Sequence, residues 1–169
     1  KAKIISREDG VLAGVRFARD IFYLKGCSVR IIKKDGAKVK PNQTILQVSG
    51  DAKTVLSCER TALNLLARMS GIATQTSLLV SKIRKINRKT KLYSTRKTAP
   101  GLRFFDKEAV AIGGGHKHRM SLNDMVMIKD NHLLVSNSIE NITKNARKQH
   151  RDVEVEVENQ RDAILAANS

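Results

Sequence analysis

The pattern of apolar and polar positions changes character twice along the chain. Up to about residue 50, short apolar runs alternate with polar and turn-forming residues, which predicts small strands around one amphipathic helix. The strands are expected at residues 2–6, 28–32 and 44–48, the helix at residues 15–24, and turns at Gly10 and residues 34–36. The first fifty residues are therefore predicted to form compact α/β structure.

From Asp51 the period becomes helical, and the segment to residue 69 keeps almost no polar face. Asp is a preferred N-cap residue type, so we expect the helix to begin at Asp51. A helix that is apolar all round is buried on all sides, often at a domain or subunit interface. Ser70-Gly71 is expected to break or kink this helix before a second, amphipathic helix runs to about residue 87.

From residue 91 onward the pattern alternates between strand and helix. The strands are expected at residues 92–95, 125–129 and 153–157, the helices at residues 103–112, 139–150 and 160–167, and a polar turn at residues 130–132. This alternation predicts parallel βα units. Three units are too few to close a barrel, so we expect one domain with interface helices at residues 1–90 and an incomplete parallel α/β barrel at residues 91–169.

The chain is strongly basic, with 32 Lys and Arg against 16 Asp and Glu and a formal net charge of +16. Such a balance indicates anionic partners, of which nucleic acid is the commonest. The basic runs at residues 82–91 and 144–151 contain no Phe, Tyr or Trp for stacking on bases, which favours solvated helix faces over RNA recognition. Cys27 and Cys58 lie far apart and in no metal-ligand spacing, which fits a reducing cytoplasm, and Cys58 is expected to be buried.

Reactive side chains gather where the predicted parallel strands end, which is where α/β sheets and barrels bind their ligands. Arg96 and Lys97 follow the first of these strands, and Lys129 closes the second. Between them the GGGHKHR segment supplies His118 and Arg119. These cations are accompanied by very few acids. Arg suits planar carboxylate or phosphate groups and Lys acts as a point charge, so we predict a receptor for a substrate with several negative charges.

Two of these features allow more than one interpretation. The glycines at residues 113–115 form either a flexible loop or a place where the backbone closely approaches a ligand. Three carboxylates alternate along the last strand, either as an exposed edge or as a row that holds Mg²⁺ and ribose hydroxyls; they are Glu154, Glu156 and Glu158. His116 and His118 have no third soft ligand nearby, which argues against a zinc site. No GxxxxGK[ST] or GxGxxG sequence is present, so nucleotide binding through those loops is not predicted.

Arg60 lies on the apolar surface of the long predicted helix. A lone charge there is costly unless an ion of opposite sign meets it. Either a buried ion pair with a neighbouring acid, such as Glu59, or an anionic ligand would supply that partner.

Five segments, in order and with matching spacing, resemble consecutive motifs of the quinolinate phosphoribosyltransferases, a family of type II phosphoribosyltransferases. They are CERTALNLLARMSGIAT (58–74), STRKTAPGLRFFDKEAV (94–110), GGGHKHRM (113–120), MIKDNH (127–132) and VEVEVEN (153–159). The segments REDGVLAG and DGAKVKPNQTIL resemble the N-terminal open α/β sandwich domain of the same family. One such motif alone is a weak signal, whereas five in register are specific.

The resemblance implies phosphoribosyl transfer from phosphoribosyl pyrophosphate to quinolinate with decarboxylation. The products are nicotinate mononucleotide, pyrophosphate and CO₂, in de novo NAD biosynthesis. It also implies Mg²⁺ as cofactor and a homodimer or larger assembly in which Arg60 enters the partner's site. By the matching motifs, Arg96, Arg119 and Lys129 clamp the two quinolinate carboxylates, and His118 supports that pocket.

The same motifs imply that Thr95 and Lys97 contact the ligands, Lys97 mainly the phosphoribosyl pyrophosphate. Glu156 would bind the ribose or its magnesium and help to stabilise the ribosyl cation. The family continues with a further acidic strand and Gly-rich phosphate turns, and with a stretch before residue 1. We therefore expect residues 1–169 alone to be inactive and poorly soluble.

Three alternatives remain. A nicotinate phosphoribosyltransferase shares the architecture and recognises a single carboxylate. A relative from molybdenum-transport operons shares the TRKT-like and GG motifs, but the HRM and IKDNH segments argue against it. A basic RNA-binding protein, from a different class, would also account for the charge.

Overall fold

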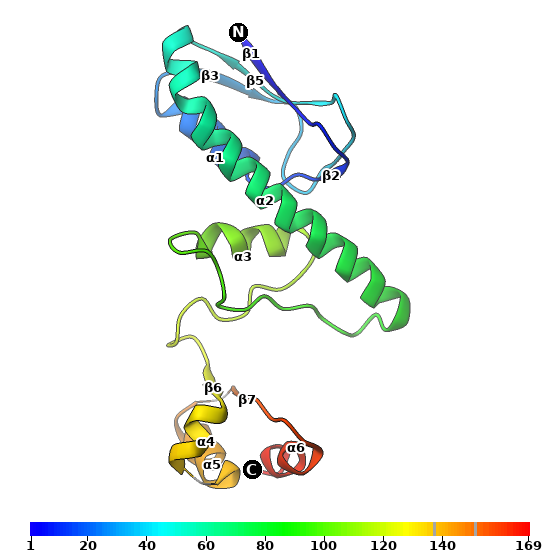
Figure 1. Ribbon diagram of the computed structural model, residues 1–169, viewed down its shortest axis with the longest axis vertical. Helices are drawn as coiled ribbons and strands as arrows, with labels where there is room; N and C mark the ends of the chain where they lie inside the picture. The colour runs from blue at the N-terminus through cyan, green and yellow to red at the C-terminus, as the bar shows by residue number, and fades with distance from the viewer. Residues whose placement is uncertain (137, 151) are drawn as a thin grey trace. The chain divides into compact units, whose positions relative to one another are not determined.

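The computed structural model describes residues 1–136, 138–150 and 152–169 and divides into two compact units, Lys1–His118 and Arg119–Ser169 (Figure 1). The first unit contains β1 (Ala2–Ile5), β2 (Gly10–Val11), α1 (Val15–Tyr23), β3 (Ser28–Ile31), β4 (Lys38–Val39), β5 (Thr44–Ser49), α2 (Ala52–Ile86) and α3 (Arg103–Ile112). The second contains β6 (Val126–Ile128), α4 (Asp130–Ser136), α5 (Ile139–Gln149), β7 (Val153–Val155) and α6 (Gln160–Ala167). The predicted α/β class is confirmed, whereas the domain boundary at residue 90 stays a prediction.

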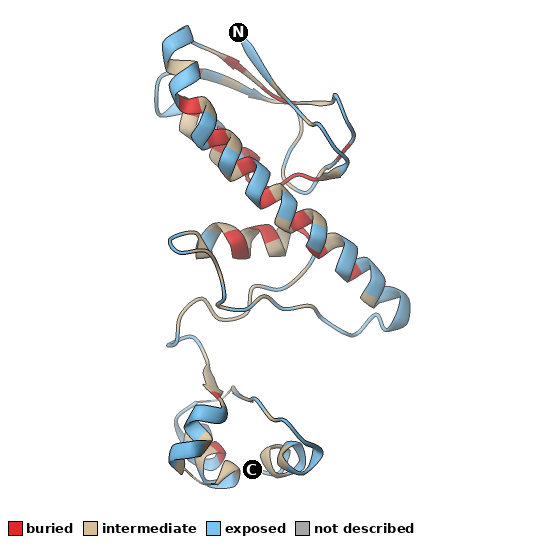
Figure 2. Ribbon diagram, viewed as in Figure 1, coloured by how far each residue is buried: buried red, intermediate tan, exposed pale blue. Residues whose placement is uncertain are grey.

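The core of the first unit lies against a three-stranded antiparallel sheet with β5 between β1 and β3. In its register Ile4 lies opposite Leu46 and Val29 opposite Val48, so apolar side chains from all three strands share one face. This face packs against α1 and the first half of α2 (Figure 2). Phe22 of α1 belongs to this core and is 2% exposed. The predicted strands and helix of this region are confirmed to within one residue. The turn at Gly10 is wrong, because that residue begins β2, which pairs with β4.

The predicted break at Ser70-Gly71 is also wrong, since α2 runs without interruption for 35 residues. Its start is as expected, because the Asp51 side chain accepts a hydrogen bond from Thr54 N at 3.1 Å. Ser70 Oγ accepts a hydrogen bond from Ala13 N at 3.1 Å, so this position of α2 is bonded to the segment that precedes α1. One glycine in a helix interior costs only about 1 kcal/mol, too little to end a helix that packs on both sides of that position.

Only one face of α2 is buried within this chain. Cys58, as predicted, is 4% exposed, and Met69 and Ala73 are 0% exposed. Leu56 on another face is 67% exposed, so burial on all sides is not achieved by this chain alone. The second half of the helix packs against α3, whose Ala109 belongs to the same buried cluster as Met69 and Ala73.

The predicted strand at residues 92–95 is reduced to one parallel bridge between Tyr93 and His116. His116 N donates to Leu92 O at 2.8 Å, and Ser94 N donates to His116 O at 2.9 Å. The segment that pairs with it stops being extended at His118, whose φ of 55° lies outside the β region. The strand was therefore correctly placed and predicted too long.

The second unit confirms the predicted parallel pairing. β6 pairs with β7 in parallel, with Ile128 opposite Val155, and α5 contacts both strands. The polar turn predicted at residues 130–132 is wrong, because Asp130 begins α4. Polar residues favour turns and helix N-termini alike, and Asp in the first turn complements the helix dipole, so local pattern could not separate the two.

The basic runs are largely solvated, as predicted. Lys82 and Lys85 near the end of α2 are exposed, as are Lys144, Arg147 and Lys148 on α5. Arg151, the last residue of the second basic run, lies outside the described residues. Over the part of the chain that the structure describes, no helix combines the length and the apolar character that crossing a membrane requires.

Candidate anion-binding site

Three predicted site residues are consecutive and follow the Tyr93–His116 bridge in the first unit. Thr95 turns the chain, because its Oγ1 accepts a hydrogen bond from Lys97 N at 3.1 Å. Thr98 N donates to Arg96 O at 2.9 Å. These bonds hold a short irregular segment on which Thr95 and Lys97 are exposed.

Arg96 differs from its two neighbours because it is half-buried. Its Nε is buried and finds no hydrogen-bond partner among the described residues. A buried donor without an acceptor costs about 1–3 kcal/mol. A planar anion is the acceptor that guanidinium fits best, because two of its oxygens can accept from two nitrogens at once.

His118 lies beside this segment. Its ring is edge-on to Tyr93 at a centroid distance of 5.9 Å, and Tyr93 also contacts the ring of His116 at 5.0 Å. Ser94 Oγ donates to Lys117 O at 2.5 Å. Ser94 directly precedes Thr95, and Lys117 directly precedes His118. The structure therefore brings together the segment that carries Arg96 and the segment that carries His118.

Helix α3 supports both segments through two residues that the sequence did not single out. Lys107 is 0% exposed, and its Nζ donates to Ser94 Oγ at 3.0 Å and to Lys117 O. Asp106 is 6% exposed; its Oδ2 accepts from Ala99 N at 3.2 Å, and both of its oxygens accept from Arg68. The hydrogen-bonded Arg68 guanidinium holds the pKa of Asp106 below its usual range, with a smaller effect in the same direction from Ala99 N.

Helical periodicity could not have found Lys107. The apolar residues Phe105, Ala109 and Ile112 define one face of α3, and a position two residues after Phe105 points to the opposite side. Lys107 is buried there because the loops before and after the helix fold over it, and that contact is long-range in sequence.

The glycine-rich segment has a structural role in the first unit. A Cβ on Gly113 would lie 2.5 Å from Ala73 O and 2.7 Å from Thr76 Cβ, both on α2. A Cβ on Gly115 would lie 3.0 Å from Thr76 Cγ2. These glycines therefore let the segment approach helix α2 closely, and the alternative that their backbone also approaches a ligand stays a prediction.

The second unit brings together two further predicted residues at the ends of its paired strands. Lys129 follows β6 and Glu156 follows β7, and Lys129 Nζ lies 2.8 Å from Glu156 Oε2. Glu156 N donates to Ile128 O at 2.9 Å, which continues the parallel pairing up to this ion pair. Arg119 donates from Nη1 to Met125 O at 3.2 Å and from Nη2 to Met127 Sδ at 3.3 Å. Its side chain therefore lies along the residues that lead into β6 and along the strand itself.

Arg60 stands apart from the other predicted residues. It is exposed on α2, and within the described ranges it forms no ion pair. The buried ion pair considered for it is therefore not formed in this chain. Arg60 shares the exposed surface of α2 with Leu56 and Asn64, and its cation is available to an anion or to a second chain.

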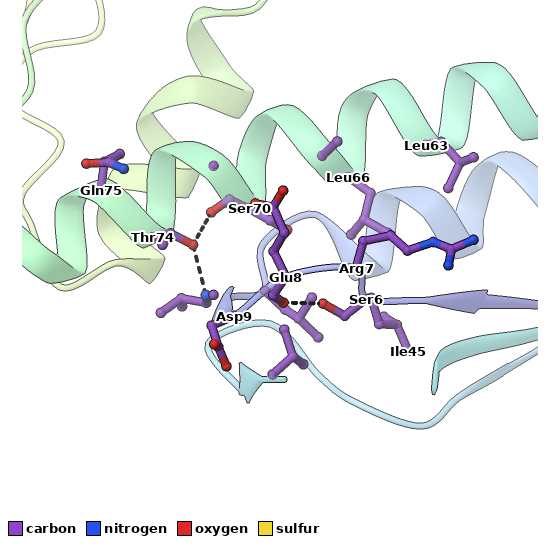
Figure 3. Close-up of a pocket in the computed structure, with 16 residues that line it drawn as sticks. Ser6, Arg7, Glu8, Asp9, Ile45, Leu63, Leu66, Ser70, Thr74 and Gln75 are labelled. Atoms are coloured by element: carbon purple, nitrogen blue, oxygen red, sulfur yellow. Dashed lines mark hydrogen bonds between the residues drawn. The ribbon is translucent and has the colours of Figure 1, made fainter. Parts of the chain in front are cut away.

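A cavity of about 500 Å³ opens elsewhere, between α2 and the segment that joins β1 to β2 (Figure 3). Its polar groups bond to one another: Ser6 Oγ donates to Glu8 O at 2.6 Å, and Thr74 Oγ1 accepts from Val11 N at 2.9 Å. No predicted site residue lines it. The cavity is distinct from the cationic groups described above.

Among the described residues no group of three or more His, Cys, Asp or Glu could hold a metal ion by itself. The cationic groups are Arg96 and Lys97 in the first unit and Arg119 and Lys129 in the second. Arg and Lys in such positions bind carboxylates and phosphates. Each unit therefore presents cationic side chains suited to anions, and in the second unit Lys129 is paired with the carboxylate of Glu156.

Comparison with known proteins agrees with this chemistry. Residues 1–70 match the N-terminal domain and residues 72–169 the C-terminal domain of quinolinate phosphoribosyl transferase. The chain is 46% identical over 167 residues to a probable nicotinate-nucleotide pyrophosphorylase [carboxylating] of Archaeoglobus fulgidus, covering 99% of this chain and 65% of that protein. It is 43% identical over 171 residues to the protein of the same description from Methanothermobacter thermautotrophicus, covering 99% and 61%.

The fold is also similar to solved structures. The nicotinate-nucleotide pyrophosphorylase from Francisella tularensis is matched with a TM-score of 0.89 at 36% identity, over 99% of this chain and 60% of that one. The chain thus spans between 60% and 65% of the length of these three relatives.

Proposed function

Because the chain belongs to the quinolinate phosphoribosyltransferase family, we propose that it takes part in phosphoribosyl transfer from phosphoribosyl pyrophosphate to quinolinate. The reaction joins the pyridine nitrogen to the anomeric carbon, releases pyrophosphate, and releases the 2-carboxylate as CO₂. The ring carbon left behind takes up a proton, and the product is nicotinate mononucleotide. This makes the protein a pentosyltransferase.

The observation that carries the proposal is the buried, unpartnered Nε of Arg96. Quinolinate has two carboxylates on neighbouring ring carbons, and a bidentate contact with one of them satisfies this donor. His118, on the segment paired with that of Arg96, would support the same quinolinate pocket. The matching family motifs assign Arg119 and Lys129 to quinolinate as well, where they would offset the negative charge that develops on the ring as CO₂ leaves.

The sugar side of the reaction falls to Lys97 and Glu156. Lys97 is exposed beside Arg96 and neutralises the leaving pyrophosphate as a point charge. The Glu156 carboxylate, which Lys129 orients at 2.8 Å, stabilises positive charge on the ribose as the anomeric bond breaks. Thr95, which is exposed and adjacent to Arg96 in sequence, offers a hydroxyl to the ligands. Positioning the pyridine nitrogen behind the anomeric carbon contributes through orientation.

Magnesium fits this site as an ion that arrives with the diphosphate. Mg²⁺ commonly uses one or two carboxylates together with substrate phosphates and water, and Glu156 is 58% exposed and able to be such a ligand. When bound, the ion would neutralise charge on the leaving pyrophosphate. The ion pair between Lys129 and Glu156 is open to solvent, so Glu156 would coordinate the ion either alone or while still paired with Lys129.

Assembly into a homodimer or larger oligomer is part of the proposal. Arg60 and the 67%-exposed Leu56 lie close together in sequence on α2, and together they suit a contact in which the arginine enters a partner's site. The cytoplasmic location expected from the cysteine pattern stays a prediction.

Steady-state turnover tests the function. The protein that carries this chain is supplied with phosphoribosyl pyrophosphate, Mg²⁺ and quinolinate labelled with ¹⁴C in its 2-carboxylate, and released ¹⁴CO₂ is counted. We expect release that depends on all three components, and no nicotinate mononucleotide when nicotinate replaces quinolinate. Turnover of nicotinate with no release from quinolinate would instead favour a nicotinate phosphoribosyltransferase.

A further inference from the structure

Lys107 is the least expected buried residue of the first unit. It lies in the middle of α3 with 0% exposure, although lysine is almost never fully buried unless its charge is paired or hydrogen-bonded. The desolvation of an ammonium group is costly, so the groups that receive its hydrogen bonds must hold it firmly. Those groups are the place to look for its role.

Two of its acceptors lie next to proposed ligand-binding residues. Lys107 Nζ donates to Ser94 Oγ at 3.0 Å, and Ser94 directly precedes the segment of Thr95, Arg96 and Lys97. The same Nζ donates to Lys117 O, and Lys117 directly precedes His118. Ser94 Oγ also donates to Lys117 O at 2.5 Å, so three groups form a closed set of hydrogen bonds.

This set lies where regular pairing stops. The two segments pair through the backbone only at Tyr93 and His116, and His118 then adopts a φ of 55°. A non-glycine residue in that region is held there by its surroundings. The Lys107 ammonium is the group that fixes the Lys117 carbonyl on one side of His118 and the Ser94 hydroxyl on the other strand.

We propose that Lys107 is a positioning residue for quinolinate, a buried ammonium that holds the Arg96 and His118 segments in register for carboxylate binding. It touches neither substrate and acts through Ser94 and the Lys117 carbonyl. The inference rests on the proposed function. A displacement of about 1 Å in a binding group can cost about 100-fold in rate. Loss of the hydrogen bonds from Lys107 should therefore weaken the interaction of Arg96 and His118 with quinolinate.

The test is Lys107→Met, which keeps the length of the side chain and removes the donors. In the protein that carries this chain, we expect the KM for quinolinate to rise at least about tenfold, with the KM for phosphoribosyl pyrophosphate within about twofold. Lys117→Met is the matched control. It removes an ammonium that also joins this segment to α3, but through Glu108 and not through the Ser94 set. Its KM for quinolinate should stay within about twofold.

The outcomes separate the possible roles. A purely structural role lowers the melting temperature and the amount of active enzyme while both KM values stay unchanged, and this result would overturn the proposal. An equal rise in Lys117→Met would also overturn it, because loss of any cation would then suffice. If Lys107→Met does not fold, Ser94→Ala removes one acceptor at a half-buried position and should raise the same KM about threefold; no change would count against the proposal. If the unsubstituted protein does not turn over quinolinate, the proposed function itself fails and the inference fails with it.

Discussion

Arg68 and Asp106 are joined by two parallel hydrogen bonds, from Nε to Oδ1 at 2.7 Å and from Nη2 to Oδ2 at 2.8 Å. The pair connects α2 to α3, and Oδ2 also accepts from Ala99 N in the loop that follows the Arg96 segment. Asp106 is 6% exposed, so its charge depends on these donors. The relationship has a consequence for the dependence of stability on pH.

Asp106→Asn should lower the free energy of unfolding at pH 7 by about 2 kcal/mol, because a buried charged hydrogen bond is lost. The folded-state pKa of Asp106 is lowered, chiefly by Arg68, so its contribution is complete above the unfolded value of about 3.9 and is lost as the pH falls through the folded value. Urea unfolding of both proteins at pH 7 and at about pH 3 measures this. The difference between them should shrink in acid; a constant difference would contradict the assignment.

Arg96→Ala should abolish tight quinolinate binding and leave the fold intact. The change removes the half-buried guanidinium whose Nε is unpartnered, and loss of a bidentate charged contact of about 3 kcal/mol corresponds to about a 100-fold rise in Kd. Calorimetric titration with quinolinate, with circular dichroism as a folding check, provides the measurement. Arg96→Lys keeps a single point charge and should recover only part of the affinity. Unchanged binding in Arg96→Ala would remove this residue from the carboxylate site.

Glu156→Gln should reduce kcat about 100-fold, as expected when a group that stabilises transition-state charge is neutralised. Its stability should change by less than about 1 kcal/mol, because the ion pair with Lys129 is solvent-exposed. Steady-state kinetics and thermal melting measure the two effects. Glu158→Gln distinguishes a single carboxylate from a row that acts together, since a row predicts a comparable loss in both variants.

Gly113→Ala and Gly71→Ala should change stability in opposite directions. A Cβ at position 113 would meet Ala73 O at 2.5 Å, and backbone atoms of a packed helix cannot easily move away, so we expect a loss of about 3 kcal/mol. A Cβ at position 71 meets nothing within 4 Å, so alanine should stabilise α2 by about 1 kcal/mol. Differential scanning calorimetry of the two variants measures both. A stabilised Gly113→Ala would show that the glycine segment is not packed against α2.

Arg60 provides a test of sites shared between subunits. Arg60→Ala and Glu156→Gln should each be nearly inactive as pure oligomers. If Arg60 enters the partner's site, mixed dimers of the two variants contain one intact site, and coexpression should restore about a quarter of the activity. Turnover of the copurified mixture measures this. No restoration would place Arg60 and Glu156 in the same subunit's site or leave Arg60 outside the site.

The sequence by itself determined the family, the α/β class and most element positions. The short apolar runs of β1, β3 and β5 and the amphipathic periodicity of α1 depend on near neighbours, and such local patterns can be recognised in a single sequence. The sequence also placed cationic residues after predicted parallel strands, where the carboxyl ends of such strands bind ligands. The structure then paired Lys129 with Glu156 as that rule requires.

Only the tertiary structure decided what depends on contacts between distant residues. Helix α2 continues through Ser70-Gly71, where Ala13 N donates a hydrogen bond to Ser70 Oγ. Position 113 requires glycine because a Cβ there would collide with the backbone of α2. Lys107 lies on the side of α3 opposite Phe105 and Ala109, and it is buried because Ser94 and Lys117 contact its ammonium group from the segments before and after the helix. These pairings lie 10 to 57 residues apart in sequence, and no local pattern encodes them. The cationic residues were evident from the sequence, whereas the scaffold that holds the Arg96 segment of the first unit depends on packing between residues distant in the chain.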